Sequence, residues 1–186
     1  MKEFPITIGF DDAKFELKSN LNTTQLIGAV CQGIRLVRVI MSPISIDGED
    51  ATNALITLAK QNEKHIQYIL TDTITFGGFN IIDLEEIYAR LKKPIIAVTE
   101  RGVDLDSVKV ALINKFPKGY KKKLQYIINA GDLYETSVET AGGSSKIYLH
   151  LKGVTFDEAN DLLKKLWIDS KMPEPVRIAH LIGKAF

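Results

Sequence analysis

The chain contains a single cysteine and lacks long apolar runs, and both absences restrict where the protein works. Cys31 has no second cysteine to pair with, so an internal disulfide is excluded and a reducing compartment is indicated. It lies in the apolar stretch 26–36, which favours a buried, unreactive thiol over a nucleophile. No apolar run approaches the roughly 20 residues that cross a membrane, and early acids in segment 1–12 leave no apolar core for a signal peptide. We therefore expect a cytoplasmic protein without a membrane partner.

Histidine and excess positive charge are also scarce. There are three histidines, and no Cys/His pair has the spacing of a zinc site. The formal net charge is +1, whereas a protein that binds polyanions over its whole surface is usually far more basic. Any nucleic-acid binding must therefore use a local patch. The run Lys121–Lys123 is one candidate for phosphate contacts, although we favour a solvated helix face.

The rest of the composition is that of an ordinary folded protein. Of the 186 residues, 45% are hydrophobic and 25% are charged, which is typical of globular domains. The length suits one domain with a single core. Because the chain shows no internal repeat or low-complexity linker, we expect a single domain over residues 1–186.

Apolar periodicity predicts strands in the first part of the chain and alternating helices and strands after it. Runs rich in branched residues predict strands, and apolar stripes at helical spacing predict helices. The expected strands are 6–10, 26–35, 36–46, 67–70, 95–98, 133–138 and 146–152. The expected helices are 51–62, 84–90, 104–116, 121–129, 157–166 and 176–186. The last two strands form a hairpin whose turn-rich loop covers 140–145.

The order of these elements predicts an α/β fold of the ribonuclease H-like type. An antiparallel meander of three strands comes first, and βα units follow it, which gives a mixed sheet covered by helices. The hairpin at 133–152 is an addition toward the C-terminus, at the edge of the sheet or beside it.

Acidic residues follow three of the predicted strands. Asp11 ends the first strand and Asp72 ends the apolar strand at 67–70, while three acids, Asp47, Glu49 and Asp50, lie between the third strand and the helix at 51–62. The first and fourth strands are adjacent in this fold, so Asp11 and Asp72 would lie side by side at the carboxyl ends of strands, where ligands bind. Each acid also has an ordinary alternative role as a turn residue or helix cap.

A cluster of acids would have a definite chemistry. Neighbouring carboxylates repel one another, and a divalent cation is the usual compensation. Mg²⁺ and Mn²⁺ prefer oxygen ligands, and a metal pair activates water and stabilises the leaving oxygen in phosphodiester cleavage. His180, expected in the last helix, is a candidate metal ligand or proton carrier, with a surface or core position as the alternative. We expect structural roles for His65 and His150.

Four segments together resemble the motifs of the endonuclease dU family, and more distantly those of endonuclease V. They are IGFDD (8–12), IDGEDAT (46–52), TDTITFGGFNIID (71–83) and MPEPVRIAH (172–180). The resemblance covers nearly the whole chain. It implies a ribonuclease H-like nuclease that acts on DNA carrying a deaminated base, uracil in the family name.

The resemblance also implies roles for single residues. The first aspartate of the endonuclease V pattern corresponds to Asp11, and the second corresponds to Asp72. The glutamate that follows the third strand in that pattern has no identical counterpart. Asp50 is the first choice for its role because it directly precedes the helix, and Asp47 is the second. The Pro-Glu-Pro…Arg…Ala part of the pattern corresponds to Pro173–Ala179, and His180 follows it directly, which favours a functional role for this histidine.

Two parts of the endonuclease V pattern are missing. Its Tyr-Ile-Pro-Gly wedge is absent from the region of Met41–Pro43, and its lysine after the Gly-Val-Ala strand is absent at Val98–Glu100. Arg101 is a candidate to replace that lysine's charge. These differences argue against carrying over the inosine specificity or the strand-opening mechanism of endonuclease V.

The leading hypothesis is therefore an endonuclease that depends on Mg²⁺ or Mn²⁺, acts on DNA with a damaged base and works in DNA repair. The predicted metal ligands are Asp11, Asp50 and Asp72, and His180 is the fourth catalytic candidate; Asp12, Asp47 and Glu49 are alternatives to Asp50. A pocket for an extruded base is predicted to use Thr75, Phe76, Gly77, Gly78 and Asn80. Its glycines would allow close backbone approach, with a tight turn as the alternative.

Two other functions compete with this hypothesis. One is a non-catalytic module that binds nucleic acid or a protein and uses its acids only as helix caps. The other is a nuclease for structured RNA. The near-neutral charge slightly favours the binding module, because a nuclease must grip phosphates. The acids at three strand ends favour the enzyme.

Overall fold

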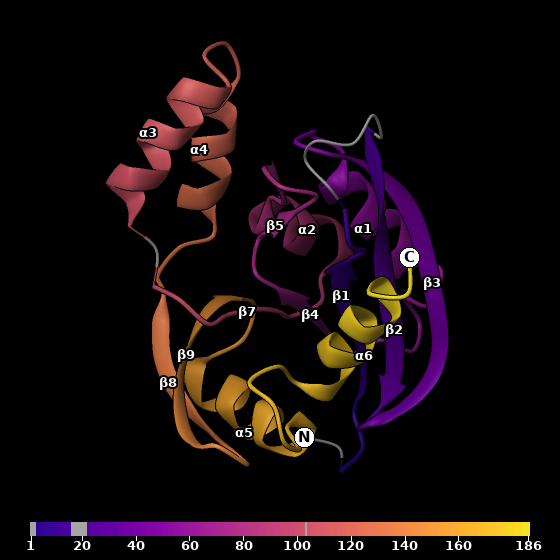
Figure 1. Ribbon diagram of the computed structural model, residues 1–186. Coiled ribbons are helices and arrows are strands. Elements are labelled where there is room, and N and C mark those ends of the chain that lie inside the picture. The colour runs from indigo at the N-terminus through magenta and orange to yellow at the C-terminus, as the bar shows by residue number, and fades with distance from the viewer. Residues whose placement is uncertain (1–2, 16–21, 103) are drawn as a thin grey trace.

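The computed structural model describes residues 3–15, 22–102 and 104–186. A mixed seven-stranded sheet in the order β3-β2-β1-β4-β7-β9-β8 runs through it, with helices on both faces (Figure 1). The strand order agrees with the fold expected from the sequence, including the adjacency of the first and fourth strands.

The N-terminal half of the sheet is the predicted antiparallel meander. It consists of β1 (Ile6–Asp12), β2 (Thr23–Gln32) and β3 (Arg35–Ser45). The turn between β2 and β3 places Gly33 at φ +58°, a backbone conformation that glycine adopts without steric cost. Cys31 is fully buried in β2, as expected, and burial raises the pKa of its thiol to about 12.

Two βα units follow the meander and complete the central sheet. The first is α1 (Ala51–Lys60) with β4 (Tyr68–Asp72), and the second is α2 (Leu84–Leu91) with β7 (Ile95–Thr99). Both β4 and β7 run parallel to β1. A two-stranded ladder that the periodicity did not predict, β5 (Thr75–Phe76) and β6 (Asn80–Ile81), folds the glycine loop back on itself. Each of its strands is only two residues long, too short for any periodic signal.

A pair of helices and a β-hairpin form the next part of the chain. Helices α3 (Leu105–Lys115) and α4 (Tyr120–Asn129) stand together beyond the end of the sheet (Figure 1). β8 (Tyr134–Thr140) and β9 (Gly143–Lys152) then extend the sheet beside β7. The loop expected at 140–145 is shorter than predicted, because the ladder continues to the pair Thr140–Gly143.

The two last helices cover one face of the sheet. α5 (Phe156–Leu166) packs its buried leucines on β7 and β9, and it begins at Thr155 with a capping box to Glu158. α6 (Glu174–Gly183) lies across β1 and β2 (Figure 1). The opposite face carries the larger core cluster, which α1, α2 and α4 cover. Within the described part of the chain, no helix has the length and apolarity to cross a membrane.

Candidate functional site

The register of the sheet brings Asp11 and Asp72 to neighbouring strand ends. β1 and β4 are parallel, and their last registered pair is Phe10 with Thr71. Asp11 and Asp72 each follow by one residue, so both carboxylates leave the sheet at the carboxyl ends of adjacent strands. This is the position at which open α/β sheets bind ligands.

Helix α6 brings His180 to the same place. The Nδ1 atom of His180 lies 2.7 Å from Oδ2 of Asp11. The helix comes this close because β1 has a glycine beneath it: a Cβ atom on Gly9 would lie 2.3 Å from the carbonyl carbon of Pro175. At the other end of the helix, a Cβ atom on Gly183 would lie 2.5 Å from the carbonyl oxygen of Asp12.

These side chains surround a cavity of about 260 Å³, called the acidic pocket below. It is lined by Asp11, Asp12, Lys14, Asp72, His180, Gly183 and Lys184. Burial, with repulsion from Asp12 second, raises the pKa of Asp11 to about 7. Burial and then repulsion from Asp11 raise the pKa of Asp72 to about 7, although His180 acts in the opposite direction. The pocket therefore disfavours two bare negative charges, which is the condition that a bound cation relieves.

Asp12 belongs to the acidic pocket, although the sequence placed it only among the alternatives to Asp50. Its Oδ2 atom accepts a hydrogen bond from the backbone N–H of Gly77, and burial raises its pKa. Successive residues of a strand point to opposite faces, so Asp11 turns toward α6 and Asp12 toward the glycine loop. The sequence feature that could have identified Asp12 is the pair of consecutive aspartates at the end of the first strand.

Asp50 is occupied elsewhere. Its carboxylate accepts hydrogen bonds from the backbone N–H and the hydroxyl of Ser45, at 3.1 and 2.8 Å, and from Nδ2 of Asn80 at 2.6 Å. Burial acts to raise the pKa of Asp50, but these hydrogen bonds outweigh it and hold the pKa below its ordinary value. Asp50 does not line the acidic pocket, and its metal-binding role stays a prediction.

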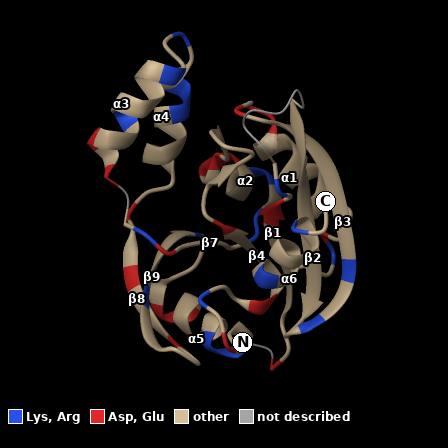
Figure 2. Ribbon diagram, in the orientation of Figure 1, with Lys and Arg blue, Asp and Glu red and all other residues tan. Residues whose placement is uncertain are grey.

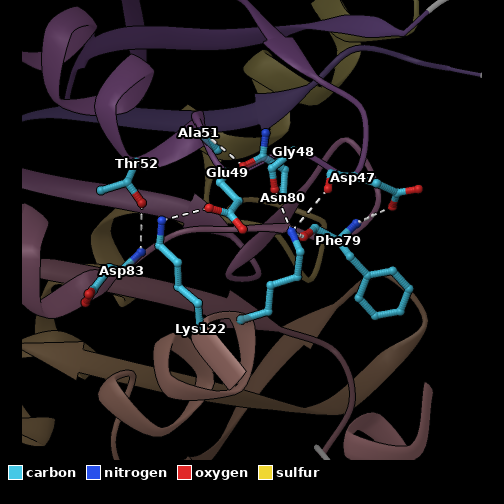
Figure 3. A network of polar contacts seen from close by, with 10 residues as sticks. Asp47, Gly48, Glu49, Ala51, Thr52, Phe79, Asn80, Asp83 and Lys122 are labelled. Atoms are coloured by element: carbon cyan, nitrogen blue, oxygen red, sulfur yellow. Dashed lines mark hydrogen bonds and ion pairs between the residues drawn. The ribbon is translucent and has the colours of Figure 1, made fainter. Parts of the chain in front are cut away.

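The two other acids of the 47–50 turn also bind the protein (Figure 3). Asp47 accepts a hydrogen bond from the backbone N–H of Phe79. It also forms an ion pair with Lys115 at 2.6 Å. Glu49 forms an ion pair with Lys122 at 2.7 Å. This turn thus connects the glycine loop on one side with α3 and α4 on the other.

Lys123 overturns the expectation of a fully solvated lysine run. It is 3% exposed, and its Nζ atom donates hydrogen bonds to the carbonyl oxygens of Asp47, Gly48 and Phe79 at 3.1, 2.6 and 2.7 Å. Burial lowers the pKa of this lysine. Helical periodicity could not show this, because the acceptors are backbone atoms from two distant loops.

The residues predicted for a base pocket divide into two groups. Thr75 lines an apolar cavity of about 320 Å³, called the apolar pocket below, together with Phe79 of the same loop. Phe76 and Asn80 are fully buried. Gly77 and Gly78 have φ of +50° and +84° and form the turn between β5 and β6, which supports the tight-turn alternative for their conformation.

The other walls of the apolar pocket come from elements that the sequence did not connect with it. They are Thr73, Ile74, Ile81, Thr99, Arg101, Gly102, Asp104, Ser107, Val108, Ile127 and His150. His150 is 5% exposed, its Nδ1 atom has no hydrogen-bond partner among the described residues, and burial lowers its pKa. No local signal marks these positions, because the pocket forms only where the base of the α3–α4 pair meets the sheet.

Thr73 separates the two pockets. It follows Asp72 directly and lines the apolar pocket, whereas Asp72 lines the acidic one. Its φ of +57° is unfavourable for a β-branched residue. The strained backbone is held because Thr73 donates its N–H to the carbonyl of Val98 at 2.8 Å and its carbonyl accepts from the hydroxyl of Thr71 at 2.7 Å. Strain of this kind is typical of functional sites.

The donor set of the acidic pocket fits Mg²⁺ or Mn²⁺. Within residues 3–15, 22–102 and 104–186, no three His, Cys, Asp or Glu side chains converge tightly enough to hold a metal ion by themselves. Mg²⁺, however, commonly binds through one or two carboxylates and completes its shell with water and substrate phosphate. Asp11 and Asp72 supply that number of carboxylates.

Comparison with known proteins gives a match over nearly the whole chain. The family model described as Endonuclease dU matches residues 6–186. The UPF0215 protein NEQ431 of Nanoarchaeum equitans is 37% identical over 186 residues, covering 99% of this chain and 89% of that protein.

Solved structures share the fold. The crystal structure of a protein of unknown function from Archaeoglobus fulgidus has a TM-score of 0.83 at 30% identity and covers 97% of each chain. Endonuclease V of Ciona intestinalis, in complex with a 24mer DNA containing an inosine followed by a ribo-adenosine, has a TM-score of 0.59 at 13% identity over 95% of this chain and 83% of that chain. The second likeness concerns the fold alone, and it confirms the ribonuclease H-like prediction.

Proposed function

This chain belongs to the endonuclease dU family, and from that premise we propose that it is a metal-dependent endonuclease that cuts DNA beside a deaminated base, uracil first, in DNA repair. Family membership and an endonuclease V-like fold indicate a nuclease. The observation that carries the finer proposal is the meeting of Asp11, Asp72 and His180 at one pocket, next to an apolar pocket of the size of a ligand site.

Asp11 and Asp72 are the proposed ligands of Mg²⁺ or Mn²⁺. Their adjacency on parallel strands and their raised pKa values support this assignment. A metal held by these two carboxylates would supply an activated water molecule and would neutralise charge on the phosphate that is cleaved. Among the alternatives to Asp50, Asp12 lines the same pocket, so we propose it as the third carboxylate.

His180 is the proposed proton carrier. With Asp11 ionised, the Nδ1–H of His180 donates to Oδ2 of Asp11, and this fixes the plane of the ring. The side chain is 31% exposed and lines the acidic pocket, so its second ring nitrogen is the one left for proton transfer. Asp11 thereby orients the histidine in addition to binding the metal.

The apolar pocket is the proposed site for the extruded base. Phe79, Ile81 and Val108 supply apolar walls for the base, and threonine and serine hydroxyls offer hydrogen bonds for its edge. Thr73 links the two pockets, since a nucleotide with its base against Thr73 would hold its phosphate near Asp72. Thr75 keeps its predicted contact role, whereas Phe76, Gly77, Gly78 and Asn80 would shape the loop behind it.

The test is cleavage of end-labelled DNA that carries a single uracil, a single hypoxanthine or no lesion, with Mg²⁺, Mn²⁺ or chelator. We expect metal-dependent nicking of the lesion strand and its loss in Asp72→Asn. Comparing Asp12→Asn with Asp50→Asn decides the third carboxylate, because only the true ligand should change the metal concentration needed for half-maximal rate.

Three results would overturn the proposal. Full metal-dependent cleavage by Asp72→Asn would remove the assigned site. Cleavage of matched structured RNA, without cleavage of any DNA, would replace the substrate, and binding without cleavage of either would support a non-catalytic module.

A further inference from the structure

Positive charge is concentrated in the α3–α4 pair. The segment 104–129 holds six lysines and two aspartates, a net charge of +4, whereas the whole chain carries only +1, so the rest of the chain is net negative. Five of these lysines fall within 115–123, a stretch without any acid, called the hairpin tip below. Figure 2 shows this charge at the end of the pair that points away from the sheet.

The five lysines of the hairpin tip fall into two groups, those that contact the rest of the protein and those that face solvent. Lys115 and Lys122 form ion pairs with the 47–50 turn, and Lys123 is buried in it. Together they fasten the pair of helices to the body. Lys118 and Lys121 are exposed, and no described residue forms an ion pair with either. Lys118 and Lys121 therefore lie on a helix pair whose position is fixed by the other three lysines, and their own charges face the solvent.

The base of the same helix pair lines the apolar pocket. Asp104, Ser107 and Val108 at the start of α3, and Ile127 near the end of α4, belong to its wall. The 11 residues of α3 therefore separate the pocket from the tip by about 16 Å at about 1.5 Å per residue. One strand of duplex DNA advances about 3.4 Å per nucleotide, so this distance corresponds to about five nucleotides.

We propose that the hairpin tip binds the phosphate backbone of DNA through Lys118 and Lys121, about five nucleotides to one side of the base held in the apolar pocket. This rests on the proposed function for the position of the base. A single-sided contact orients the strand on the enzyme, because phosphate contacts set register without reading sequence. The hairpin tip would then be the local positive patch that a nearly neutral protein needs in order to bind DNA.

The first experiment measures binding without cleavage. A fluorescent duplex with one central uracil is titrated with protein in chelator over a series of salt concentrations. For Lys118→Gln combined with Lys121→Gln, we expect the slope of log K against log salt to fall by about 2, since each phosphate contact contributes about 0.9. The matched control, Lys60→Gln with Lys64→Gln, removes two exposed lysines near the start of β4, at the opposite end of the sheet, and should keep the wild-type slope.

The second experiment shortens the DNA from one end at a time. Affinity should fall about tenfold or more when the duplex ends within about four nucleotides of the uracil on one side, and stay unchanged for equal shortening on the other. The lysine variant should already have lost this dependence. Unfolding of the variant by urea should match that of the wild type, because both positions are exposed.

The outcomes separate this proposal from the nuclease function. The double lysine variant could show the expected fall in salt slope although the wild-type protein never cuts DNA. That result would support DNA binding by the hairpin tip and would refute the nuclease function. Four outcomes would each overturn the proposed role of the hairpin tip. The lysine variant could cut DNA normally with an unchanged salt slope, or shortening either flank could lower affinity equally. The variant could also change binding only with matched RNA, or the wild type could fail to bind the duplex.

Discussion

Buried carboxyl groups dominate the behaviour expected of single residues. The pKa values of Asp11 and Asp72 rise from 3.8 to about 7, first because of burial and then because of neighbouring acids. The folded state therefore keeps these protons after the unfolded chain has released them. Stability from these groups is fully present below the unfolded pKa of 3.8 and falls as pH rises toward the folded value of about 7.

Asp72→Asn should remove part of this dependence by replacing the carboxyl with a neutral amide of the same shape. Without metal, we expect the variant to exceed the wild type by about 2 kcal/mol in free energy of unfolding near about pH 8, and to equal it near about pH 4. Urea unfolding across this range is the measurement. Asp161→Asn, at an exposed position of α5, should follow the wild-type profile, and a variant less stable than wild type near pH 8 would contradict the reasoning.

At the scale of elements, the site depends on how closely α6 approaches β1. Gly9→Ala would place a methyl group 2.3 Å from the backbone of Pro175, so the helix must shift and carry His180 away from Asp11. We expect a loss of about 2–4 kcal/mol in free energy of unfolding, and slower cleavage if the proposed function holds. Gly142→Ala, in the turn between β8 and β9, is the control, since its added Cβ atom finds no neighbour closer than 3.7 Å. Equal stability of the two variants would show that α6 can move away from β1 at little cost in free energy.

The attachment of the α3–α4 pair gives a second prediction at this scale. Lys123→Met fills the same volume but leaves the carbonyls of Asp47, Gly48 and Phe79 without their shared donor. We expect the free energy of unfolding to fall by about 2–4 kcal/mol, measured by urea unfolding. Lys121→Met, two residues earlier on the exposed surface, should change it by less than about 0.5 kcal/mol. Similar effects from both variants would mean that the buried contacts are not needed.

At the scale of the whole molecule, metal binding and stability are linked. A cation that binds only the folded state raises the melting temperature by mass action, and it must displace protons held with a pKa of about 7 at Asp11 and Asp72. We expect Mn²⁺ to raise the melting temperature over chelator by several degrees near about pH 8, and by less near about pH 6. The rise should vanish in Asp72→Asn. A rise of equal size in that variant would place the cation elsewhere.

The fold could be predicted because its signals are local and agree with one another. Apolar runs in β4 and β7 mark strands covered on both faces, and the stripe of α5 with its capping box marks an amphipathic helix. The order of elements then places β1 beside β4, which is why the adjacency of Asp11 and Asp72 followed from the sequence. The short ladder of β5 and β6 escaped prediction because its pairing depends on packing against the 45–47 turn.

The class of fold, the two neighbouring aspartates and the family could all be inferred before folding is considered, because periodicity, strand order and motif spacing are properties of the linear chain. The packing of the elements was needed to show that Asp12 faces the acidic pocket while Asp50 binds Ser45 and Asn80. The same packing places Lys123 in the interior and Lys121 on the surface. The physical reason is the same in both cases: neighbours in sequence differ in role according to which distant backbone supplies their hydrogen-bond partners, and that is known only when the elements have packed.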